Sequence, residues 1–125
     1  SQSELGALMQ ARGFQISRNG TQYEFFSNDV IIFTSAQCEP NKPISQITLL
    51  LDVPLVPQDE RAFERMLGEG VEIAEATQGR LVDDSGINLT EAAVISIRQH
   101  LDGLFANLDK NGIPAGSSAA RRLFS

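Results

Sequence analysis

The chain has 125 residues, 42% of them hydrophobic and 21% charged, which is enough apolar material for one globular domain with its own core. Ten basic residues against sixteen acidic ones give a net charge of −6, a balance that excludes a general binder of nucleic-acid phosphates. No apolar run approaches the roughly eighteen residues of a membrane-spanning helix. The single cysteine, Cys38, has no partner for a disulfide within the chain.

Residue types that carry catalysis or bind metals are sparse. His100 is the only histidine, and no Cys or His stands at zinc-ligand spacing from it. The sequence therefore predicts no catalytic residue, no metal site and no cofactor. A small hydrolase using Asp83, Asp84 and His100 is the weakest alternative, because aspartates before Ser85-Gly86 are typical of a turn.

The first half of the chain predicts one helix followed by four strands. Apolar residues at helical spacing indicate a helix over Ser3–Arg12 that ends at Gly13. Asn19-Gly20 predicts a type I′ hairpin, in which both central residues have positive φ. The expected strands are Phe14–Ser17, Thr21–Phe26, Val30–Cys38 and Gln46–Val53.

The second half predicts two longer helices. The first runs from about Gln58 to Gln78, and the second runs from Glu91 to about Leu108 with Thr90 as its N-cap. Two short strands are expected between them, over Arg80–Asp84 and Ile87–Leu89. The domain is expected to span residues 1–110, with residues 111–125 as a tail packed on it or extending from it.

The order α-β-β-β-β-α-β-β-α predicts an α+β fold. Consecutive strands joined by hairpin-length links form an antiparallel sheet, and we expect helices packed on one face and the other face open.

Alternation along the strands assigns side chains to the two faces. The inward set includes Tyr23, Phe25, Ile32 and Thr34. The outward set comprises Gln22, Glu24, Phe26, Ile31, Phe33, Ser35, Gln37, Gln46, Thr48, Leu50 and Asp52. Apolar groups with a polar rim are typical of a shallow docking site for a peptide or a partner helix. In the alternative interpretation, the loop over 39–45 or the C-terminal tail covers this strip.

Several motifs, in this order, resemble the C-terminal domain of the ZipA family of bacterial cell division. They are Leu51-Asp52-Val53-Pro54, Ala62-Phe63-Glu64-Arg65-Met66, Gly79-Arg80-Leu81-Val82-Asp83-Asp84 and Leu89-Thr90. The resemblance implies a split β-α-β fold without enzymatic activity. It also implies that the exposed sheet face binds the C-terminal peptide of FtsZ, and that a membrane helix and linker outside this chain tether the domain at the cytoplasmic face of the inner membrane.

The resemblance places the peptide groove on Gln22, Ser35, Gln37, Thr48 and Leu50, and alternation adds Phe33. Gln37 and Leu50 stand where the family has bulkier apolar groups, so we expect a smaller and more polar groove. The family's first strand is expected to be missing ahead of the first helix, which leaves a sheet edge exposed or filled by another segment. A homo-oligomer that pairs through this edge or through the tail is therefore the main alternative function.

Overall fold

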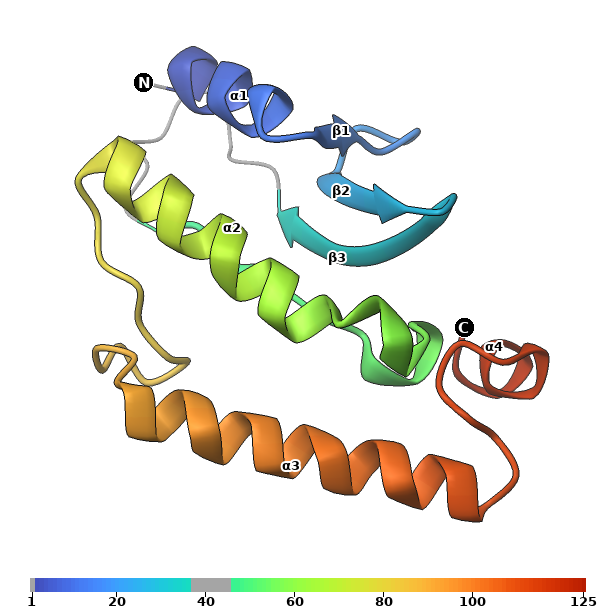
Figure 1. Cartoon of the computed structure of the whole chain (residues 1–125). Helices are drawn as coiled ribbons and strands as arrows, with labels where there is room; N and C mark the ends of the chain where they lie inside the picture. The colour runs from blue at the N-terminus through green and yellow to red at the C-terminus, as the bar shows by residue number, and fades with distance from the viewer. Residues whose placement is uncertain (1, 37–45) are drawn as a thin grey trace. The chain divides into compact units, whose positions relative to one another are not determined.

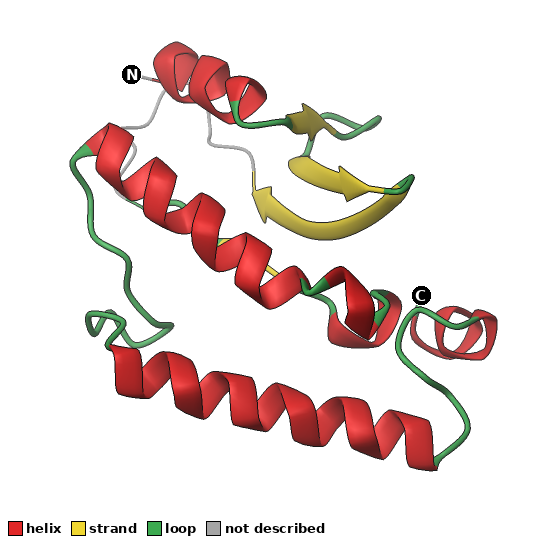
Figure 2. Ribbon diagram, in the orientation of Figure 1, coloured by secondary structure: helices red, strands yellow, loops and turns green. Residues whose placement is uncertain are grey.

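A computed structural model describes residues 2–36 and 46–125 (Figure 1). The fold consists of two units, Ser1–Leu51 and Asp52–Ser125. The first holds the sheet and one helix, and the second is helical apart from its connecting loops and one isolated β-bridge (Figure 2).

The first unit contains helix α1 (Gln2–Ala11) and a four-stranded antiparallel sheet in the order β1-β2-β3-β4. This confirms the α+β class and the expected helix. The strands are β1 (Phe14–Ile16), β2 (Gln22–Ser27), β3 (Val30–Ala36) and β4 (Leu49–Leu50). β4 is much shorter than the expected Gln46–Val53, because the chain enters 3₁₀-helix η1 (Val53–Leu55) with Pro54 in its first turn.

The two hairpin turns differ from the expected pattern. Of Asn19 and Gly20 only Gly20 has positive φ, at 72°, so the expected type I′ turn is wrong there. The Asn19 carboxamide oxygen instead accepts a hydrogen bond from the Thr21 hydroxyl at 2.7 Å. The two-residue turn with positive φ lies between β2 and β3, at Asn28 (51°) and Asp29 (63°).

The core of the first unit lies between α1 and the sheet. Leu5 and Met9 on α1 are buried, as are Phe14 on β1 and Tyr23 on β2. A Cβ added at Gly6 would lie 3.3 Å from the Tyr23 hydroxyl, which shows how closely α1 approaches this face of the sheet.

The second unit contains η1, η2 (Gln58–Glu60), α2 (Ala62–Thr77), α3 (Glu91–Lys110) and α4 (Ser118–Phe124). The expected helix from Gln58 is interrupted at Arg61, which has a φ of 52°. Thr90 is the N-cap of α3 as expected, and its hydroxyl accepts a hydrogen bond from the Ala93 N–H at 3.1 Å. The two strands expected between α2 and α3 are reduced to one isolated bridge, Val82 to Asn88.

An ion pair joins the two long helices of the second unit. α2 and α3 run in opposite directions (Figure 1), and the Arg98 side chain on α3 lies 3.2 Å from the Glu64 carboxylate on α2. The tail forms α4, a helix that the sequence did not predict. Leu123 and Phe124 of this helix are exposed, and Ala120 is its buried residue.

Candidate functional site

The register of the sheet defines its two faces, because directly paired residues of antiparallel strands share a face. Phe14, Phe25 and Phe33 are paired across β1, β2 and β3 and their rings contact one another. This face also carries Tyr23, whose hydroxyl lies beside α1. We call it the covered face.

The opposite face carries a row of four paired residues, one from each strand. Gln15 pairs with Glu24, Glu24 with Thr34, and Thr34 with Leu50. Gln15 is exposed, Glu24 and Thr34 are half-buried, and Leu50 is 56% exposed. We call this the exposed face, and Leu50 is its most prominent apolar side chain.

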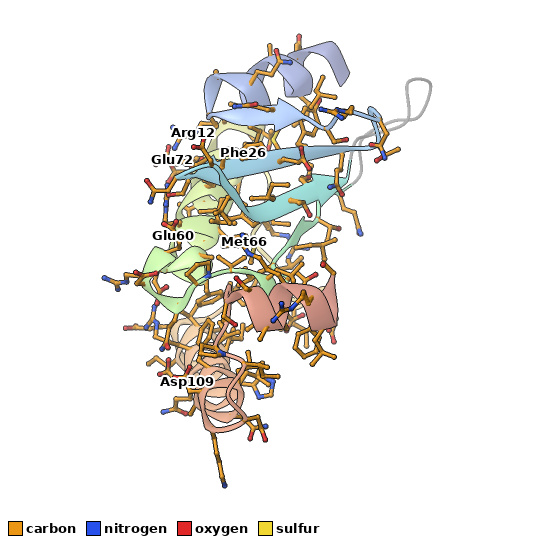
Figure 3. All side chains as sticks on the ribbon, turned by 90° about the vertical axis from the view of Figure 1, so that its right-hand side faces the viewer. Arg12, Phe26, Glu60, Met66, Glu72 and Asp109 are labelled. Atoms are coloured by element: carbon orange, nitrogen blue, oxygen red, sulfur yellow. The ribbon has the colours of Figure 1, made fainter. Side chains whose placement is uncertain are left out.

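Two more apolar side chains lie on the exposed face, on the turn side of a β-bulge. Phe25 pairs with Phe33 but Phe26 pairs with Ile31, so β3 contains one extra residue, Ile32, at this point. Phe26, labelled on β2 in Figure 3, is 36% exposed and its partner Ile31 is 37% exposed. An exposed apolar pair therefore lies at the hairpin end of β2 and β3.

Gln22, Thr48 and Leu50, three of the six predicted groove residues, fit the exposed face. Gln22 lies two residues before Glu24 on the same strand, and its amide nitrogen is 3.4 Å from the Glu24 carboxylate. Thr48 directly precedes β4 and is exposed. The sequence thus assigned these residues and Leu50 to the solvent side correctly.

The expectation that Phe33 and Ser35 lie on the open face is wrong. Each is only 1% exposed, and Ser35 pairs with Tyr23 on the covered face. Thr34, expected to point inward, belongs to the exposed face instead. Gln37, the remaining predicted groove residue, lies outside the described residues.

One extra residue in β3 accounts for these errors. A bulge-free hairpin with the turn at Asn28-Asp29 would pair Phe25 with Ile32, and both belong to the predicted inward set. The bulge shifts β3 by one residue from Phe33 onward, which exchanges the faces of the following side chains. Nothing in the apolar run Val30–Phe33 signals the shift, since both of its alternating sets are apolar.

The exposed face is nearly neutral. Among the residues of the four described strands, Glu24 is the only charged one. Such a face offers apolar contact and neutral hydrogen-bonding groups, together with one carboxylate.

The residues of the hydrolase alternative have structural roles or are exposed. One oxygen of the Asp83 carboxylate accepts hydrogen bonds from the N–H groups of Ser85 and Ile87, at 2.9 and 3.0 Å, as expected of a turn-forming aspartate. His100 is exposed on α3. In the described parts of the chain, no cluster of three or more His, Cys, Asp or Glu side chains has a geometry that would hold a metal ion.

A second apolar feature lies within the helical unit. A pocket of about 240 Å³ is lined by residues of η1, α3 and α4, namely Val53, Pro54, Leu104, Asn107, Leu108, Asn111 and Phe124. The Gly116 N–H donates a hydrogen bond to the Pro54 carbonyl at 2.9 Å, which fixes the start of the tail beside η1. The tail thus contributes a wall of this pocket.

An antiparallel sheet with its own helix on one face, and exposed apolar side chains among polar ones on the other, defines a protein-docking domain. The family model of the ZipA C-terminal FtsZ-binding domain matches residues 9–100. The chain belongs to this family of protein-binding domains of bacterial cell division, which confirms the resemblance drawn from the sequence. No curated protein and no solved structure gives a significant match.

Among the helices of the described residues, none combines the length and the apolar character that crossing a membrane requires.

Proposed function

We propose that the exposed face of the sheet binds the C-terminal peptide of FtsZ, and that a tether outside this chain links the complex to the cytoplasmic face of the inner membrane. Membership of the FtsZ-binding family supports the partner. The observation that carries the docking site is Leu50, a large apolar side chain that remains 56% exposed on the face opposite α1.

The apolar side chains of the exposed face set the scale of the binding energy. Leu50, Phe26 and Ile31 are all exposed in the free chain. Complete burial of one such side chain gives roughly 1.5–3 kcal/mol, and these three are already partly covered. Because they are few, we expect a peptide that binds at micromolar rather than nanomolar concentration, with apolar contact as the main driving force.

The polar side chains of the same face provide hydrogen bonds to a peptide backbone. Gln15, Gln22 and Thr34 surround the apolar groups, and Thr48 stands at the start of β4. Amides and hydroxyls both donate and accept, so they satisfy peptide N–H and C=O groups that the contact removes from water.

The test is a titration of isotope-labelled domain with the FtsZ C-terminal peptide, followed by amide chemical shifts. We expect perturbations at β2, β3 and residues 48–50, and loss of binding in Leu50→Asp. Ile95→Asp is the matched control, because Ile95 is an apolar side chain on α3 with 47% exposure and the substitution is identical. Unchanged affinity in Leu50→Asp, or perturbations confined to the second unit, would contradict the proposal.

The homo-oligomer alternative would pair two copies through a sheet edge or through the tail. In the described sheet the edge strands are β1, with three residues, and β4, with two. Edge strands this short present few backbone groups for pairing with another chain, so they disfavour association through the edge. Sedimentation over a range of concentrations separates the two functions, because a stable dimer without affinity for the peptide would favour the alternative.

A further inference from the structure

Glu24 lies close to the apolar side chains of the exposed face. It lies in the row that joins Gln15, Thr34 and Leu50, two strands away from Leu50. Neighbouring strands are about 4.8 Å apart, so the backbones at Glu24 and Leu50 are separated by about 10 Å. Phe26 lies on the same face two residues along β2, at about 7 Å from Glu24. Leu50 thus lies across the strands from Glu24, beyond Thr34, and Phe26 lies along β2 from it.

The side-chain hydrogen bond of Glu24 comes from the neutral amide of Gln22, at 3.4 Å. No Lys, Arg or His occurs in the four strands as the structure describes them. A segment that crosses the strands from Leu50 towards Gln15 passes over the Glu24 carboxylate.

The identity of the covering group decides whether such a contact is favourable. An apolar side chain placed over Glu24 would remove the carboxylate from water without a partner, which is costly. A Lys or Arg placed there would pair with it, and a guanidinium would also contact the nearby ring of Phe26. Glu24 consequently disfavours a segment that places an apolar side chain over it and favours one that places Lys or Arg there. A single charge creates specificity in this way.

We infer that Glu24 makes the exposed face selective for a segment with a basic side chain about 10 Å from an apolar one. Leu50 contacts the apolar side chain and Glu24 pairs with the basic one. In an extended segment that crosses the strands, side chains on the same side recur about every 6.6 Å, so the basic and the apolar residue stand two or four positions apart. This inference rests on the proposed function, since it specifies the chemistry of the peptide bound at the same face.

The test uses four forms of the domain: the unmodified chain, Glu24→Gln, Asp29→Asn and Leu50→Asp. For each form we measure the affinity for the FtsZ C-terminal peptide and for peptide variants in which one Lys or Arg at a time is replaced by Gln. Glu24→Gln should weaken binding of the parent peptide about three- to tenfold at low salt, as expected for a partly exposed ion pair. One of the Gln-substituted peptides should bind the unmodified domain more weakly than the parent peptide does, by a similar factor. The same peptide should bind the Glu24→Gln domain as tightly as the parent peptide does. Asp29→Asn is the matched control, because it removes one negative charge from the adjacent turn at a positive φ that Asn tolerates. Leu50→Asp reports on the proposed function itself.

The outcomes separate the two proposals. If Leu50→Asp abolishes binding while Glu24→Gln and Asp29→Asn bind equally well at low salt, the docking face stands and the role of Glu24 is overturned. If Glu24→Gln weakens binding but every Gln-substituted peptide is affected equally in both domains, the pairing is also overturned. Failure of the unmodified domain to bind the parent peptide would contradict both the docking face and the role of Glu24. A thermal unfolding curve for each variant distinguishes loss of binding from loss of fold.

Discussion

The rings of Phe25 and Phe33 are stacked across β2 and β3, with centroids 4.6 Å apart and planes 11° from parallel. Phe14 on β1 meets both rings edge-on, at centroid distances of 5.3 and 5.8 Å. Such aromatic pairs add about 0.5–1.5 kcal/mol to the free energy of burying their surface. This cluster fixes the register of three strands, and it therefore determines which side chains remain for the exposed face.

The bulge is what allows this stacking. It leaves Ile32 without a direct partner on β2, so Ile32 and Phe33 are both buried although they are consecutive in a strand. Beyond the bulge, Phe33 belongs to the core and Thr34 takes its place on the exposed face. A single inserted residue thus adds an aromatic ring to the core and removes it from the candidate docking surface.

Phe33→Ala is expected to destabilise the first unit by about 3–5 kcal/mol, because it leaves a cavity in the aromatic cluster. Leu50→Ala removes a side chain that is 56% exposed and should cost less than about 1 kcal/mol. Urea denaturation followed by the fluorescence of Tyr23, the only tyrosine, reports on this unit, since the chain has no tryptophan. Equal costs for the two substitutions would show that Phe33 does not belong to the core.

The sequence predicted features with a local physical cause. Thr90 is an N-cap because its side chain bonds within one helical turn, and Gly13 follows α1 at a φ of 99° because only glycine adopts that conformation easily. The bulge in β3 was not predictable, because it depends on how distant aromatic rings pack. The same holds for α4, whose burial of Ala120 arises from contacts that the tail sequence does not encode locally.

The turn between β2 and β3 should tolerate glycine but not a β-branched residue. Asn28 has a φ of 51°, a region in which Val clashes with its own backbone and Gly does not. Asn28→Val is expected to lower the free energy of unfolding by about 1–2 kcal/mol more than Asn28→Gly does, because both remove the Asn side chain and only Val adds the clash. Thermal unfolding of both variants checks this, and an equally stable Asn28→Val protein would contradict the assigned turn.

Loss of the N-cap should weaken α3. Thr90→Ala removes the hydrogen bond from the Ala93 N–H and is expected to cost about 1 kcal/mol. Ser96→Ala is the matched control, because Ser96 is exposed within the same helix and loss of its hydroxyl should be neutral or slightly stabilising. Hydrogen exchange of the first turn of α3 is the direct measurement. Faster exchange is expected in Thr90→Ala only, and similar exchange in both variants would show that the cap contributes little.

The attachment of the tail to η1 depends on the absence of a side chain at Gly116. A Cβ there would lie 2.4 Å from Cδ of Pro57, and the residue also has a φ of 77°. Gly112 has a similar φ of 73° but open space around it, so Gly112→Ala isolates the backbone cost of about 1–2 kcal/mol. Gly116→Ala adds a collision with a rigid ring. We therefore expect Gly116→Ala to release α4 and open the pocket lined by Phe124. Trypsin should then cleave faster after Arg121 and Arg122. Gly112→Ala should leave the cleavage rate close to that of the unmodified chain. Equal cleavage rates in the two variants would mean that the close approach of Gly116 to Pro57 does not hold the tail.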